Sequence, residues 1–170
     1  MKKETIIQKA EAFCKEHQVD QFPVNIVSIC NRLNISVFER PLPSGVSGFI
    51  VIQEEPFKNF ETGRLIMVNS SDSAARKRFT IAHELAHYVL HKKEGEPIYA
   101  HRDAGQHGGI ETEANIFASN LLMPKALVKK YLSIFDDCTN RFRVEQLALA
   151  SAVSNEAAHI RLDQLGLMGG

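Results

Sequence analysis

The sequence predicts an α+β fold in which a small sheet of about three strands, mixed or antiparallel, packs against a helical bundle. Three observations lead to this fold class. Three short segments rich in β-branched and aromatic residues fall in the first 70 of the 170 residues. Long stretches with apolar residues at helical spacing fill most of the remainder. Strands grouped together ahead of a run of helices are typical of an α+β arrangement, and the length is that of one domain.

Composition excludes several classes of protein. Lys and Arg total 20 and Asp and Glu total 20, so the formal charge of 0 argues against wholesale binding to nucleic acid or an anionic membrane. Hydrophobic residues at 44% and charged residues at 24% are ordinary globular values and exclude a disordered chain. Cys14, Cys30 and Cys138 form no CxxC pair, which predicts reduced thiols. Without a signal-peptide pattern or a membrane-spanning apolar run, we expect a cytoplasmic protein that binds no membrane.

The first half of the chain supplies the strands. Residues 3–17 have helical spacing, and Pro23 opens a second short helical pattern that runs to Leu33. The strands are predicted at residues 35–38, 46–52 and 64–68, and the polar residues 53–62 are predicted to form a loop.

The second half is predicted to be helical. Residues 73–92 carry apolar side chains on most sides, which indicates a central helix, and residues 69–73 offer several N-cap candidates. Residues 93–109 are glycine-rich and irregular. Further helices are predicted at residues 110–123, 125–133, 141–150 and 154–165. We expect one domain over residues 1–170, with residues 1–20 as an N-terminal helical extension and residues 140–167 as a C-terminal helical hairpin.

The strongest chemical signal is the HExxH pattern His83-Glu84-Leu85-Ala86-His87 inside the central helix. Residues four apart lie on nearly one face of a helix, about one turn apart, so the two imidazoles can bind one metal ion. Glu84 can reach a water on that ion as general base and can return the proton to a leaving amine. The alternative is a helix that merely carries two surface histidines four residues apart.

A catalytic zinc usually takes three protein ligands, so one more is needed. Glu111 and Glu113 open the next strong helical pattern, whose apolar face should pack on the HExxH helix. Either carboxylate would complete a His₂Glu set suited to Zn²⁺, one ion per chain. We favour Glu113 over Glu111 from its spacing on the packing face; either could instead be a first-turn glutamate favoured by the helix dipole.

Other histidines and a tyrosine lie close to the motif in sequence. His91 continues the stripe of His83 and His87 but is about 12 Å from His83 along the helix, which favours a core or supporting role over ligation. One of Tyr99, His101 or His107 could stabilise the oxyanion of a tetrahedral intermediate. The alternative is a mobile lid whose polar side chains are solvated.

The chain contains two separated motifs, residues 76–91, RKRFTIAHELAHYVLH, and residues 111–124, ETEANIFASNLLMP. Together they resemble the motifs of the ImmA/IrrE family of metallopeptidases. The similarity extends over about residues 20–167, and Ala86 stands where many members have glycine. The resemblance implies a zincin-like fold, His83, His87 and Glu113 as zinc ligands, and Glu84 as catalytic base. It also implies cleavage of a partner transcriptional repressor with a helix-turn-helix domain, in a mobile element or a stress response.

The sequence therefore predicts a zinc endopeptidase that cleaves a protein partner. One alternative is a non-catalytic, metal-stabilised regulator that binds a repressor or another protein without cutting it. A second is DNA binding through residues 147–162, which have something of a helix-turn-helix rhythm. Because residues 154–164 contain one arginine, Arg161, against Glu156 and Asp163, we favour a hairpin that completes the core, with no direct contact to nucleic acid.

Overall fold

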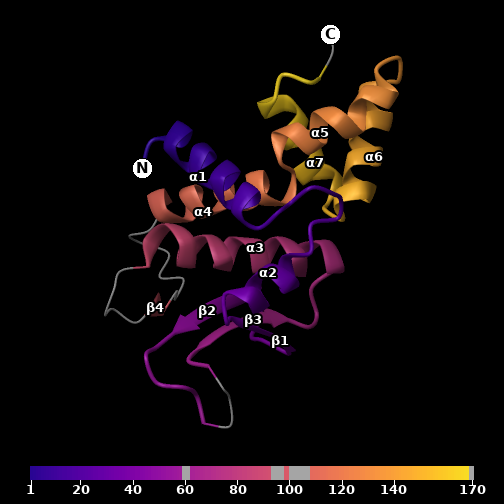
Figure 1. The fold of residues 1–170 in the computed structure, drawn as a ribbon. Coiled ribbons are helices and arrows are strands. Elements are labelled where there is room, and N and C mark those ends of the chain that lie inside the picture. The colour runs from indigo at the N-terminus through magenta and orange to yellow at the C-terminus, as the bar shows by residue number, and fades with distance from the viewer. Residues whose placement is uncertain (59–61, 93–97, 100–107, 169–170) are drawn as a thin grey trace.

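The structure is a computed structural model that describes residues 1–58, 62–92, 98–99 and 108–168 (Figure 1). Its elements, in chain order, are α1 (Lys3–Glu16), α2 (Ile26–Arg32), β1 (Ser36–Arg40), β2 (Gly48–Ile52), β3 (Arg64–Asn69), α3 (Ala74–His91), β4 (Ile98–Tyr99), α4 (Gly108–Leu122), α5 (Lys125–Leu132), a 3₁₀ turn (Ser133–Phe135), α6 (Asn140–Ser151) and α7 (Asn155–Gln164). The predicted α+β class is confirmed.

The sheet has the strand order β1-β3-β2-β4 and is mixed. β1 runs parallel to β3, whereas β2 runs antiparallel to both β3 and β4. Inward residues alternate along the strands, with Ile50 and Ile52 on β2 and Ile66 and Val68 on β3 buried. β4 is an addition to the three predicted strands. It has only two residues and lies in the segment that the sequence predicts to be irregular.

Helix α3 runs between the sheet and α4, and α1 packs on α4 in turn (Figure 1). It therefore has packed neighbours on opposite sides, which explains the apolar residues around most of its circumference. Ile81, Ala82, Leu85 and Ala86 are all buried. The prediction of a central helix is confirmed, and the motif histidines lie in its buried stretch, Thr80–His87.

Two helical contacts extend the core beyond the central helix. α1 packs on α4, where the ring centroids of Phe13 and Phe117 lie 5.5 Å apart. α7 is tied to the end of α4 by Arg161, which donates to the carbonyl oxygen of Met123 (2.9 Å) and to Oδ1 of Asn120 (2.8 Å). Arg161 is only 3% exposed. The single arginine of residues 154–164 thus bonds to protein acceptors and presents no charge to a phosphate.

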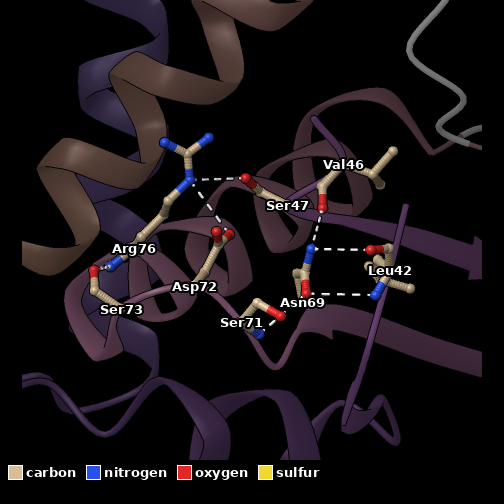
Figure 2. Close-up of polar contacts among 8 residues, drawn as sticks. All are labelled: Leu42, Val46, Ser47, Asn69, Ser71, Asp72, Ser73 and Arg76. Carbon is tan, nitrogen blue, oxygen red and sulfur yellow. Dashed lines mark hydrogen bonds and ion pairs between the residues drawn. The ribbon is translucent and has the colours of Figure 1, made fainter. Parts of the chain in front are cut away.

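The start of α3 is fixed by the buried side chain of Asn69, at the end of β3 (Figure 2). Its Nδ2 donates to the carbonyl oxygens of Val46 (2.9 Å) and Leu42 (3.4 Å). Its Oδ1 accepts from the backbone N–H groups of Ser71 (3.1 Å) and Leu42 (3.4 Å). One amide group therefore joins the β1–β2 connection to the turn that leads into α3.

The first turn of α3 is capped by a side chain. Oγ of Ser73 accepts from the backbone N–H of Arg76, and this bond satisfies one of the free donors at the helix start. Nε of Arg76 lies 2.8 Å from Oγ of Ser47 and 3.3 Å from Oδ2 of Asp72 (Figure 2). These bonds fix the direction in which α3 leaves the sheet.

Within the described ranges, none of the helices has both the length and the apolar character needed to cross a membrane.

Candidate metal centre

Three donor side chains from two helices meet between α3 and α4. Nε2 of His83 lies 3.1 Å from Nε2 of His87, one turn along α3. The carboxylate of Glu111, in the first turn of α4, places Oε2 3.0 Å from Nε2 of His83 and Oε1 3.3 Å from Nε2 of His87. His83 and His87 are buried, and Glu111 is half-buried, so the group opens to solvent on the Glu111 side.

This donor set fits a zinc ion. Each of the three residues offers one ligand atom, and these atoms all lie within 4.8 Å of one another. Zinc binds nitrogen and oxygen donors at about 2.0–2.1 Å in a tetrahedron, whose corners are then about 3.4 Å apart. The 3.1 Å between the two imidazole nitrogens is close to that edge length, and so is the distance from each nitrogen to its nearer oxygen of Glu111, Oε2 for His83 (3.0 Å) and Oε1 for His87 (3.3 Å). Two imidazoles and one carboxylate also leave a fourth corner for water or substrate, as in catalytic zinc sites.

Glu113, the favoured third ligand at the sequence level, does not lie in this cluster. Two residues along a helix is a rotation of about 200°, so Glu113 leaves α4 from a different position than Glu111 and reaches the end of the histidine stripe of α3. Its Oε2 is 3.8 Å from Nε2 of His91, and its Oε1 contacts the N-terminal ammonium of Met1. The structure therefore brings Glu111, the other candidate of the sequence analysis, to the motif histidines.

His91 stands beside the cluster without joining it. Its ring centroid is 5.6 Å from that of His87. Burial lowers the pKa of His91, and a hydrogen bond with the backbone of Ile110 acts in the opposite direction. This environment agrees with a supporting role at the α3–α4 interface.

Glu84 is 4% exposed and directly follows His83 on α3. It belongs to the buried stretch of α3 that also contains His83 and His87. Of the oxyanion candidates, His101 and His107 lie outside the described residues, as does the side chain of Tyr99.

One neighbour of the cluster has no counterpart in the sequence analysis. Oδ1 of Asn115, on α4, lies 2.9 Å from Nδ1 of His83. The spacing of Asn115 from Glu111, four residues on one predicted helix, was the signal available in the sequence.

Comparisons with known proteins find a peptidase family and two relatives from Bacillus and one of its phages. Residues 30–163 match the model of a peptidase family described as the IrrE N-terminal-like domain. The chain is 28% identical over 137 residues to "Uncharacterized immunity region protein 2" of Bacillus phage phi105, covering 81% of this chain and 78% of the phage protein. It is 22% identical over 161 residues to "Metallopeptidase ImmA" of Bacillus subtilis strain 168, covering 95% and 86% of the two chains.

The matched segment contains the central helix, the donor cluster and most of the C-terminal helices. It is most of the chain, and both motifs of the sequence analysis lie within it. The chain therefore belongs to the IrrE N-terminal-like peptidases, the ImmA/IrrE family that its two motifs resemble.

Proposed function

We propose that this protein is a zinc-dependent endopeptidase that cleaves a partner protein, with His83, His87 and Glu111 as the zinc ligands. The observation that carries the proposal is the convergence of three donor residues from two helices: Nε2 of His83 and Nε2 of His87 lie 3.1 Å apart, and each faces one carboxylate oxygen of Glu111, at 3.0 and 3.3 Å. A surface pair of histidines would have neither the burial of His83 and His87 nor an aligned carboxylate from a second helix.

A zinc ion at these ligands would polarise the substrate carbonyl and lower the pKa of the attacking water. Glu84 would accept the proton of that water and deliver it to the leaving amine. Glu84 is buried on α3 directly beside the first proposed ligand, His83. No serine or cysteine nucleophile is required, in keeping with the burial of Cys14 and Cys30.

A transcriptional repressor is the proposed substrate. This part of the proposal rests on the resemblance to the ImmA/IrrE family and on the name of the phage relative, an immunity region protein. The three free cysteines are compatible with a reducing compartment, and we propose the cytoplasm as the site of action.

The test compares the wild-type protein with Glu84→Gln at equal zinc content. Each is incubated with a peptide library made from a digested bacterial proteome and with a helix-turn-helix repressor encoded beside its gene. New peptide termini are counted by mass spectrometry. Removing the base should lower cleavage by about 10²–10⁴-fold. Glu156→Gln makes the same chemical change on the exposed side of α7 and should cleave like wild type.

Equal cleavage by wild type and Glu84→Gln would contradict the assignment of the base. If both proteins bind the repressor tightly and neither cuts it, the non-catalytic regulator replaces the endopeptidase.

A further inference from the structure

We propose that Asn115 is a positioning residue of the metal centre, which aims the Nε2 lone pair of His83 at the metal. The inference rests on the proposed metal site and adds to it a residue on the far side of the first histidine. Its basis is the 2.9 Å contact between Oδ1 of Asn115 and Nδ1 of His83.

The contact suits the tautomer that a metal ligand needs. A neutral imidazole carries one N–H, and an amide oxygen can only accept a hydrogen bond. Nε2 of His83 faces the other two donors of the cluster, so a bound metal would take the lone pair of Nε2 and leave the proton on Nδ1. Oδ1 of Asn115 is placed to accept the hydrogen bond of that proton and so to hold the ring in this orientation.

The bond also fixes the orientation of the ring. Asn115 of α4 holds the ring of His83 at Nδ1. The ring presents Nε2 to Glu111, which also lies on α4. Asn115 and Glu111 are four residues apart, so they are neighbours on one face of α4. A single helix face thus supplies both a proposed ligand and the group that orients another, which makes the centre sensitive to the register of α4 on α3.

The packing of α4 on α3 fixes the position of the α4 face that carries Glu111 and Asn115. Ala114 and Ala118, next to Asn115 in sequence and on the following turn, are fully buried. Asn115 itself is exposed as a residue, whereas His83 is 7% exposed. Truncating Asn115 therefore removes an acceptor from a buried imidazole without opening a cavity in the core, and the variant should fold.

Three variants separate orientation of His83 from a general effect on the helix. Asn115→Ala removes the acceptor. Asn115→Asp keeps an acceptor oxygen in place and strengthens it with a charge. Thr112→Ala is the matched control, because Thr112 is exposed on the same helix, three residues away, and its Oγ1 bonds only to the backbone of Gly108 within the described contacts. Zinc dissociation constants are measured by competition with a chelator of known affinity.

Asn115→Ala should weaken zinc binding by about 10–100-fold, the usual effect of removing a hydrogen-bond partner of a ligating histidine. Asn115→Asp should bind zinc at least as tightly as wild type, and Thr112→Ala should match wild type. The inference is overturned if Asn115→Ala binds like Thr112→Ala, or if the Ala and Asp variants are weakened equally. Wild-type protein that binds no zinc would instead contradict the proposed function itself. This outcome differs from the two that overturn the role of Asn115.

A second readout uses the zinc-loaded protein, in which the proton of His83 is on Nδ1. ¹H–¹⁵N spectra report how fast this proton exchanges with water. It should exchange slowly in wild type and in Thr112→Ala, and much faster in Asn115→Ala, which lacks the acceptor. Equally slow exchange in Asn115→Ala would show that another group accepts from Nδ1 and would overturn the inference.

Discussion

The carboxylate of Glu111 lies 3.0 Å from Nε2 of His83, although the two residues belong to different helices. Donor atoms from separate helices converge in this way only where the helices are held at a fixed crossing and register. Asn69 fixes the start of α3, and the helix then packs between the sheet and α4. The residues that fix α3 thus serve the candidate metal centre without contacting it.

Replacing Asn69 by Ala should lower the free energy of unfolding by about 2–4 kcal/mol, because backbone groups of Leu42, Val46 and Ser71 lose their partner. Chemical denaturation monitored by circular dichroism measures this change. Asn31→Ala, on the exposed side of α2, should stay within about 0.5 kcal/mol of wild type. A loss for Asn69→Ala no larger than that of the control would contradict the role assigned to this side chain.

Replacing Arg161 by Met should cost about 2–4 kcal/mol, because it leaves the buried oxygens of Met123 and Asn120 without a donor. Burial lowers the pKa of Arg161 to about 10, so the guanidinium stays charged at neutral pH and needs both acceptors. Arg141→Met removes an arginine whose side chain is 90% exposed and should be nearly neutral. Thermal unfolding of the two variants side by side decides the point, and equal melting temperatures would refute it.

The three cysteines should differ sharply in reactivity. Burial raises the pKa of both Cys14 and Cys30 to about 12, whereas Cys138 is exposed. The thiolate is the reactive form, so both buried thiols stay protonated as the pH rises through 8 and up to about 12. A disulfide reagent at pH 8 should titrate one thiol per native chain and three after denaturation. Prompt reaction of all three in the native protein would contradict the packing of α1 and α2.

Most of the fold could be predicted from the sequence, because each long element carries its own periodicity. The central helix, for example, was expected at residues 73–92 and spans Ala74–His91. The strands were found within about two residues of their predicted bounds. β4 was missed because two residues are too few to show an alternating pattern. α4 begins at Gly108, inside the segment predicted to be irregular, since its first residues are glycines that favour no helix.

The motif histidines were named from the sequence because both lie on one helix, where spacing alone sets their faces. The third carboxylate could not be chosen in this way, since it depends on how α4 is rotated against α3. The apolar face of α4 is broad because it packs on two helices, α3 and α1. Phe117 is directed at Phe13 of α1, a contact that the sequence analysis did not anticipate. Because the apolar positions of α4 serve its contacts with both α3 and α1, they do not show whether Glu111 or Glu113 faces the motif histidines.

The most direct test of the metal centre is the zinc content of purified protein, measured by elemental analysis for wild type, Glu111→Gln and Glu113→Gln. The two substitutions are the same chemical change two residues apart on one helix. The account predicts about one zinc per chain in wild type and in Glu113→Gln, and a strong loss in Glu111→Gln, because a neutral amide is a poor replacement for a carboxylate ligand. Loss of zinc in Glu113→Gln with full occupancy in Glu111→Gln would contradict the assignment of the third ligand. Wild-type protein that holds no zinc even after the metal is added back would contradict the metal centre as a whole.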